Sequence, residues 1–317
     1  MLRRNLAGLI GLLAVGAALP SGLALAQSQV QVVASFSILA DMVGAVGGAR
    51  VQVVTLVGAD GDAHTFQPRA SDAQKITAAQ IVFVNGLGFE GWIERLIRAS
   101  EFRGPIVTVS DGIAPLTTRA EHDEGPVGVA SRRVLKPLYQ SDPHAWHDLS
   151  RAHVYVDNIA RALSQLDPAG APEYRERAHR YKLQLGELDA EARRQIGAVP
   201  AAKRKVITSH DAFQYFSHAY GVEFLAPAGI STESEASAGD VARIIRQARA
   251  QGIRAVFVDN IAERGVVRQI GQELGLSIDG TLYADALSDS SGPAPTFLKL
   301  FEHNLRLLTA AMSANAS

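Results

Sequence analysis

Short apolar runs rich in β-branched residues alternate along this chain with longer segments whose apolar residues recur at helical spacing. In the first half the strand-like runs fall at residues 31–36, 51–57, 81–85 and 106–109, and the helical segments at 38–46 and 89–100. Apolar runs of this length, separated by helices, are typical of a parallel sheet covered on both faces. The first half is therefore predicted to be an α/β lobe.

The same alternation resumes after residue 200. Strands are predicted at 205–208, 255–258 and 280–283, and helices at 211–220, 239–251, 263–274 and 296–312. Each half then looks like a four-unit β/α lobe, and right-handed crossovers make each lobe doubly wound.

Between the halves, two segments break the alternation. Residues 114–133 contain prolines, glycines and a cluster of acids, and are predicted to form an exposed loop. A helix at 151–166 is followed by a long charged helix at 172–196 with few apolar positions, which indicates a bridge between two lobes. The predicted domains are an N-terminal lobe at 27–167, a bridging helix at 168–200 and a C-terminal lobe at 201–317.

The N-terminus has the pattern of a signal peptide. Arg3 and Arg4 precede an apolar run at 6–19, and the Ala-Leu-Ala sequence at 24–26 matches a cleavage site. The apolar run is too short for a good membrane span, so we expect residues 1–26 to be removed from an exported, soluble protein. The sequence has no cysteine, which excludes disulfides, thiolate metal ligands and a lipid-modified cysteine. We therefore expect a periplasmic protein without a lipid anchor.

The charge of the chain is close to neutral. The formal net charge is −1, and it becomes −3 when Arg3 and Arg4 leave with the signal peptide. This balance argues against a nucleic-acid partner. The length of 317 residues is sufficient for two domains.

Four polar residues stand out because each lies in a turn or beside the end of a predicted strand. They are His64 in GDAHTFQP (residues 61–68), His144 in DPHAW (142–146), His210 in SHDAF (209–213) and Asp285 in GTLYAD (280–285). Ligands of open α/β sheets bind beyond the carboxyl ends of the strands, so loops from two facing lobes meet in the cleft between them. Three imidazoles and one carboxylate can close a tetrahedron around zinc, which favours metal binding over catalysis.

The neighbouring residues fit this interpretation. Pro143 keeps Asp142 extended and projects His144 from a rigid turn. Asp142 and Asp211 flank two of the candidate ligands and are placed to orient the imidazole rings.

Spacing alone leaves other interpretations open, because separations this long are not diagnostic of a metal site. His64 alone would be a surface residue by default, His210 could cap the next helix, and Asp285 could cap a turn. His147, three residues after His144, is expected to lie behind the ligands or at the surface rather than to bind the ion directly. His122 is expected to be a solvated loop residue.

Taken together, the motifs resemble those of the solute-binding proteins of zinc/manganese ABC importers, the metal-binding cluster A-I family. The matching segments are residues 61–68, 142–146, 209–216 and 281–285, together with GISTESE at 229–235, and the resemblance covers nearly all of the mature chain. It implies two Rossmann-like (β/α)4 lobes joined by a long rigid helix, with the metal site in the cleft between the lobes. It also implies His64, His144, His210 and Asp285 as the ligands.

The resemblance further implies capture of Zn²⁺ and its delivery to an ABC permease of the inner membrane. A histidine at the third ligand, here His210, accompanies zinc in that family, whereas a glutamate accompanies manganese. Mn²⁺ and Fe²⁺ remain alternative cargoes.

We expect a monomer and no enzymatic activity, and we leave open whether a periplasmic metallochaperone loads the metal. A zinc hydrolase using Glu233 or Glu235 as its base, and an adhesin, are the competing functions. The segment at 114–133 lacks the histidine-rich loop that many zinc-specific relatives carry.

Overall fold

The structure is a computed structural model that describes residues 29–119, 139–234, 236–261 and 264–314. The predicted signal peptide, His122 and Glu235 lie outside these residues, as does most of the loop predicted at 114–133.

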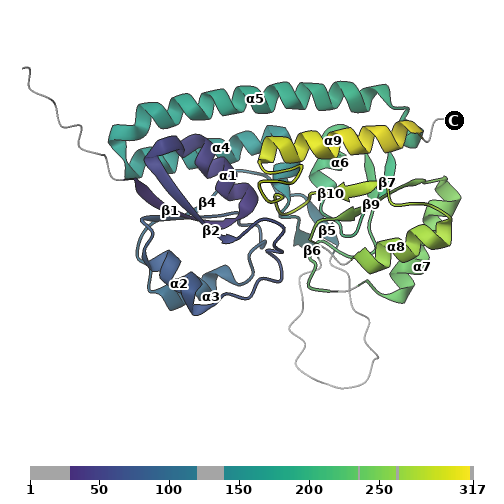
Figure 1. Cartoon of the computed structure of the whole chain (residues 1–317), viewed down its shortest axis with the longest axis horizontal. Helices are drawn as coiled ribbons and strands as arrows, with labels where there is room; N and C mark the ends of the chain where they lie inside the picture. The colour runs from purple at the N-terminus through teal and green to yellow at the C-terminus, as the bar shows by residue number, and fades with distance from the viewer. Residues whose placement is uncertain (1–28, 120–138, 235, 262–263, 315–317) are drawn as a thin grey trace, which may run out of the picture.

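The N-terminal lobe is a four-stranded parallel sheet in the order β2-β1-β3-β4. Its strands are β1 (Val30–Phe36), β2 (Val51–Val57), β3 (Ile81–Val84) and β4 (Ile106–Thr108). Its helices are α1 (Ser37–Gly47), α2 (Ala70–Thr77), α3 (Ile93–Ser100) and α4 (Leu149–Leu166). The helices α1 and α4 lie above the sheet and α2 and α3 below it (Figure 1). Because both faces are covered, β1 and β3 are almost entirely buried, which explains their uninterrupted apolar sequences.

The C-terminal lobe repeats this architecture with the strand order β10-β9-β7-β8, again parallel throughout. Its strands are β7 (Lys205–Ile207), β8 (Glu223–Leu225), β9 (Ala255–Asp259) and β10 (Gly280–Leu282). Its helices are α6 (Gln214–Tyr220), α7 (Ala238–Gln251), α8 (Arg264–Leu274) and α9 (Phe297–Ala314). The prediction of two doubly wound α/β lobes with a long helix is confirmed.

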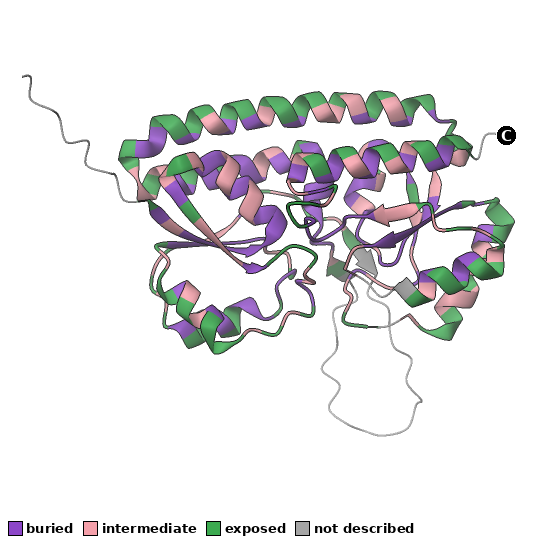
Figure 2. Cartoon of the chain, in the orientation of Figure 1, coloured by how far each residue is buried: buried purple, intermediate pink, exposed green. Residues whose placement is uncertain are grey.

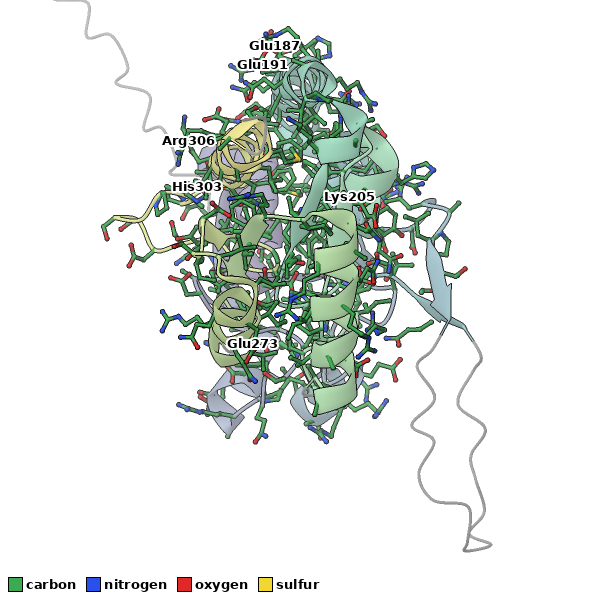
Figure 3. All side chains as sticks on the ribbon, turned by 90° about the vertical axis from the view of Figure 1, so that its right-hand side faces the viewer. Glu187, Glu191, Lys205, Glu273, His303 and Arg306 are labelled. Carbon is green, nitrogen blue, oxygen red and sulfur yellow. The ribbon has the colours of Figure 1, made fainter. Side chains whose placement is uncertain are left out.

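The long helix α5 (Ala171–Ala198) runs across the top of both lobes, with α9 beside it (Figure 1). Its buried residues recur at steps of three, four or seven positions, which places them on one face, toward α4 and the lobes; they are Ala171, Tyr174, Ala178, Tyr181, Leu185, Ala192 and Ile196. The opposite face is exposed (Figure 2), and even the large apolar Leu183 is 55% exposed there. Figure 3 shows Glu187 and Glu191 on this outer side.

The hydrophobic core explains how the lobes are fixed to one another. One large cluster joins residues of the first sheet, such as Phe36, to Leu185 in α5 and to Phe216 and Phe301 in α6 and α9. A second, smaller cluster lies within the C-terminal lobe, where Ile207 and Val256 pack on Ile244 of α7 and Ile270 of α8. The lobes therefore share one core on the side of α5.

Five elements differ from the sequence-based prediction. The helix α2 and the strand β8 were not predicted, and the helix expected to begin at residue 89 begins at Ile93. In the segment predicted to be a loop, β5 (Thr117–Arg119) pairs antiparallel with β6 (Tyr139–Ser141). Single 3₁₀ turns complete the assignment, at Gly48–Arg50, Ala145–His147, Pro168–Gly170 and Ala201–Lys203.

Across the described ranges, no helix combines the length and the apolar character that a membrane crossing requires.

Candidate metal centre

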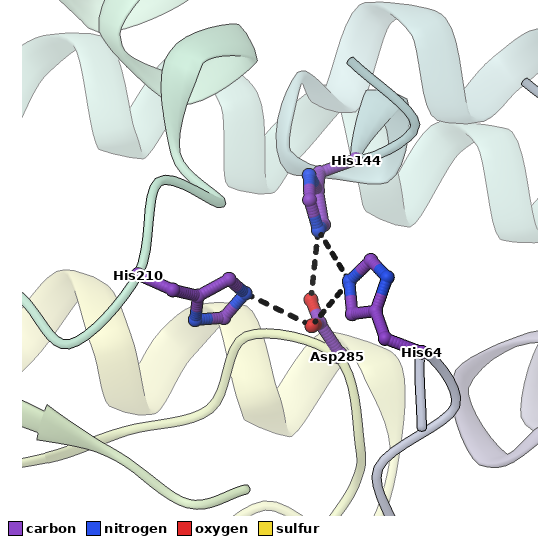
Figure 4. A group of neighbouring side chains, drawn as sticks. All are labelled: His64, His144, His210 and Asp285. Atoms are coloured by element: carbon purple, nitrogen blue, oxygen red, sulfur yellow. Dashed lines mark hydrogen bonds and ion pairs between the residues drawn. The ribbon is translucent and has the colours of Figure 1, made fainter. Parts of the chain in front are cut away.

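The structure brings the four predicted residues together where the two lobes face each other (Figure 4). His64, His144, His210 and Asp285 are all buried, and each offers one ligand atom within 4.8 Å of the others. We call this group the four-donor site. It joins segments that lie as far apart in the sequence as residues 64 and 285.

The separations between donor atoms suit a single ion. The Nε2 atoms of His64 and His144 lie 3.3 Å apart. One carboxylate oxygen of Asp285 lies 3.3 Å from Nε2 of His64 and 3.0 Å from Nε2 of His210, and the other lies 3.4 Å from Nε2 of His144. A tetrahedron with metal–ligand distances of about 2.0–2.1 Å has edges of roughly 3.4 Å. Four of the separations are therefore close to an edge of such a tetrahedron, and the whole set of donor atoms lies within 4.8 Å, as one bound metal ion requires.

Strand ends position three of the donors, as expected from the sequence. His64 follows β2, His210 follows β7 and Asp285 follows β10, each within seven residues of the strand end. His144 differs, because it comes between β6 and the 3₁₀ turn at Ala145–His147.

The ring of His144 is held by the carboxylate two residues before it. Oδ1 of Asp142 lies 2.7 Å from Nδ1 of His144 and also accepts its backbone N–H at 2.9 Å. The turn is fixed from both lobes, since Asn85 donates to the carbonyl of Pro143 and Tyr215 donates to the carbonyl of Asp142. This arrangement keeps a proton on Nδ1 and directs the lone pair of Nε2 into the site. The role predicted for Asp142 agrees with this geometry.

The ring of His210 is held by Asp259, and the expectation for Asp211 was wrong. Oδ2 of Asp259 lies 2.6 Å from Nδ1 of His210 and accepts its backbone N–H at 3.1 Å. Asp211 instead accepts a hydrogen bond from Gln214. The sequence contained a signal for Asp259, because this acid ends the buried strand β9, next to β7 in the sheet.

His64 is held mainly through its backbone. Oδ1 of Asp62 accepts the N–H of His64 at 2.8 Å, and Nε1 of Trp92 donates to the carbonyl of Ala63 at 2.7 Å. The ring packs edge-on against Phe89. Within the described residues, no carboxylate bonds its Nδ1.

The buried charges perturb one another strongly. Burial by itself would lower the pKa of His144, but the carboxylates of Asp285 and Asp142 outweigh it and raise the pKa to about 9. Burial opposes protonation of His210 in the same way, yet Asp285 and Asp259 raise its pKa well above the ordinary value. Burial would raise the pKa of Asp285, but the two imidazoliums hold it well below the ordinary value. Without a cation, positive charge on the imidazoles therefore balances Asp285.

His147 is not one of the four donors. Of the two positions expected for it, behind the ligands or at the surface, the surface is excluded because His147 is buried; its ring packs on Phe213 with centroids 4.6 Å apart. Burial, reinforced by the nearby His144, lowers its pKa to about 3, so it is a neutral ring behind the site.

Of the residues considered for other roles, Glu233 is exposed and donates its backbone N–H to Ser231. The two tryptophans, Trp92 and Trp146, are buried packing residues. Each also secures a residue next to a donor, because Nε1 of Trp146 donates to the carbonyl of Ala284 at 3.0 Å. His153, His179, His218 and His303 lie in helices.

Comparison with known proteins adds the family. The protein family described as zinc-uptake complex component A, periplasmic, matches residues 32–311. The iron-binding protein YfeA of Yersinia pestis is 32% identical over 273 residues, covering 85% of this chain and 82% of its own. The manganese-binding lipoprotein MntA of Halalkalibacterium halodurans is 29% identical over 286 residues, covering 89% of this chain and 88% of its own.

Among solved structures, the periplasmic zinc-binding protein TroA of Treponema pallidum aligns with a TM-score of 0.80 at 28% sequence identity. The alignment covers 90% of this chain and 99% of TroA. The names of these three relatives specify three different metals.

Proposed function

This chain belongs to the family of periplasmic zinc-uptake components, which are substrate-binding proteins of metal ABC importers rather than enzymes, and we propose that its cargo is Zn²⁺, bound by the four-donor site. Proteins of this kind work with a permease and an ATPase of the inner membrane. The observation that carries the proposal is the convergence of four ligand atoms from four segments of both lobes within 4.8 Å.

The chemistry of the donors supports zinc as the cargo. Three imidazole nitrogens and one carboxylate suit a tetrahedral zinc ion, whereas manganese prefers oxygen ligands. TroA, named as a zinc-binding protein, supports this choice. MntA and YfeA, named for manganese and iron, make those ions the alternative cargoes.

Capture would exchange protons for metal. The ion loses water and displaces the protons that His144 and His210 hold on Nε2, while their Nδ1–H groups keep donating to Asp142 and Asp259. The pre-oriented rings need no reorganisation, which favours tight binding.

The remaining proposals concern location and partners. The signal-peptide pattern and the family together support the periplasm as the location. Because one chain supplies all four donors, we expect a monomer that needs no second subunit to bind metal. Loading by a separate metallochaperone stays open, and metal transfer between purified proteins would test it.

The test of the function is metal analysis of purified protein with competition titration. We expect one tightly bound zinc per chain and preference for zinc over manganese. His210→Glu should shift this preference toward manganese, because it replaces a nitrogen donor by a carboxylate. Tighter binding of manganese or iron by the wild-type protein would assign it to the alternative cargo, and absence of tight binding of any of these ions would contradict the proposal.

A further inference from the structure

The boundary between the lobes has a buried side and an exposed side. On the buried side, Leu287 donates its N–H to Ser37 at 2.9 Å and Phe297 donates its N–H to Asp41 at 2.8 Å. These contacts lie next to the core that both lobes share. The buried side therefore holds the lobes as one unit.

On the exposed side, side-chain contacts connect the lobes through the loop that carries His64. Oγ1 of Thr232 donates to Oδ2 of Asp62 at 2.6 Å, and Nδ2 of Asn260 donates to Oδ1 of Asp60 at 3.0 Å. Thr232 and Asn260 belong to loops of the C-terminal lobe. Such exposed or partly buried side-chain contacts open at lower cost than a shared core.

Asp62 connects this exposed side to the metal site. Its Oδ1 accepts the N–H of His64 at 2.8 Å. Its Oδ2 accepts two hydroxyls, from Thr65 in its own loop at 2.9 Å and from Thr232 in the other lobe at 2.6 Å. One carboxylate therefore fixes the backbone of a donor and receives a hydrogen bond across the cleft. Loss of the Thr232 contact would remove one cross-lobe restraint on the His64 loop without touching the other three donors.

A cavity adjoins this contact. It has a volume of about 260 Å³, and its lining includes Asp62 and Thr232 together with His210 and the apolar Ile261 and Val267. A cavity of this size holds several water molecules. The cavity reaches the four-donor site beside His210, and the pair Asp62–Thr232 forms part of its wall.

We propose that Thr232 and Asp62 are positioning residues that form a latch on His64, and that the latch sets the rate of metal release. The inference rests on the proposed function. When the latch opens, the His64 loop moves first and the ion stays on His144, His210 and Asp285, open to the cavity. Closure of the latch restores the fourth donor.

The test is the rate at which zinc-loaded protein loses its ion to excess chelator in a stopped-flow experiment. Thr232→Val removes the hydroxyl and keeps the shape, and release should accelerate about tenfold, as expected when a hydrogen bond to a charged group is lost. Thr65→Val removes the other hydroxyl that donates to Oδ2 of Asp62 but leaves the contact with the opposite lobe intact. It should accelerate release clearly less than Thr232→Val. Thr232→Ser restores the hydroxyl and should release zinc at nearly the wild-type rate.

Ser231→Ala is the matched control, because it removes a hydroxyl from the same loop whose hydrogen bond, among the described residues, is with Glu233 of that loop. It should leave the release rate unchanged. The unfolding temperature of each metal-free variant separates a general loss of stability from a specific change in release. If Thr232→Val does not fold, Thr232→Ala removes the same hydroxyl with a smaller side chain.

The outcomes distinguish the latch from the function. A release rate within twofold of wild type in the Thr232 variants, with one zinc still bound per chain, would overturn the latch and leave the proposed function intact. Equal acceleration by Thr65→Val would also overturn it, because the contact across the cleft would then have no special role. Failure of the wild-type protein to bind zinc would instead refute the proposed function.

Discussion

The three histidines of the four-donor site are held in place in two different ways: His144 and His210 through their rings, and His64 through its backbone. The first two are fully buried, and a carboxylate holds each ring at Nδ1. His64 is 6% exposed and is held through its backbone by Asp62. Two rings are thus oriented before any ion arrives, whereas the third depends on the position of a loop. On the proposal made above, capture relies on the two fixed rings and release on the loop that carries His64.

The largest effect should come from removing donors. His144→Ala should weaken zinc binding on the order of 10³-fold, because a structural zinc site divides its binding energy among four ligands. His64→Ala should weaken it less, because a loop must be ordered to place that ring. Competition titration against chelators of known affinity measures both. His179→Ala on the exposed face of α5 should change nothing, and a loss at His144 smaller than tenfold would refute its role as a ligand.

The next largest effect should come from pH. Because the pKa of His144 is raised to about 9 and that of His210 is raised as well, both rings are protonated at neutral pH without metal. Binding must displace these protons, so affinity should rise with pH through the neutral range, and the contribution of His144 should level off above about pH 9.

With two protons displaced, zinc affinity should rise by up to 100-fold per pH unit as long as both rings are protonated in the metal-free protein. Calorimetry in buffers of different ionisation enthalpy measures the protons released. Affinity that is flat between pH 6 and 8 would show that the fixed rings do not carry these protons.

A smaller effect should come from the carboxylates that orient the fixed rings. Asp142→Asn and Asp259→Asn should each weaken binding about 10- to 100-fold, because an amide orients the ring less firmly and lowers its basicity. Asp211→Asn is the matched control, since Asp211 bonds Gln214 and neither ring. Equal losses of zinc affinity at all three positions would contradict the claim that Asp142 and Asp259 orient the rings whereas Asp211 does not.

The smallest effect should come from His147. His147→Phe keeps a flat ring against Phe213 and removes both nitrogens, so zinc affinity should stay within about twofold of wild type. A loss comparable to that of His144→Ala would make His147 a ligand and end the present assignment. Thermal unfolding of the metal-free variant controls for packing.

Much of the fold could be predicted because its longest elements have a clear pattern, apolar in the strands and charged with helical spacing in the long helix. The strands β1 and β2 have seven residues each, and α5 has a continuous helical pattern. The strand β8 escaped prediction because it has three residues, of which only Leu225 is buried. The helix α2 buries only Asp72 and Ile76, too few positions for a visible period.

The predicted start of α3 was too early because the apolar residues before Ile93 favoured a helix. The chain there instead forms a turn whose backbone conformation is not helical. Gly86, Leu87 and Gly88 all have positive φ, and Glu90 accepts the N–H groups of Asn85 and Gly86. These contacts hold a turn up to Ile93 despite the apolar Phe89 and Trp92.

Part of the site could likewise be predicted from the sequence, and part could not. Its donors could be predicted because motifs at strand ends mark them, and a shared sheet edge brings such loops together. The support of His210 was missed, although Asp259 ends a buried strand, because that strand lies 49 residues away in the sequence. Adjacency in sequence favoured Asp211, whereas adjacency in the sheet decides the contact. The link between Asp62 and Thr232 depends on how the lobes face each other, which no local pattern encodes.

The most direct test of the account is a crystal structure of the zinc-loaded protein with anomalous scattering measured at the zinc edge. We predict one peak of full occupancy, about 2.0–2.2 Å from Nε2 of His64, His144 and His210 and from an oxygen of Asp285. A peak bound elsewhere, or one that lacks the donors of either lobe, would contradict the claim that two lobes grip a single cation between them.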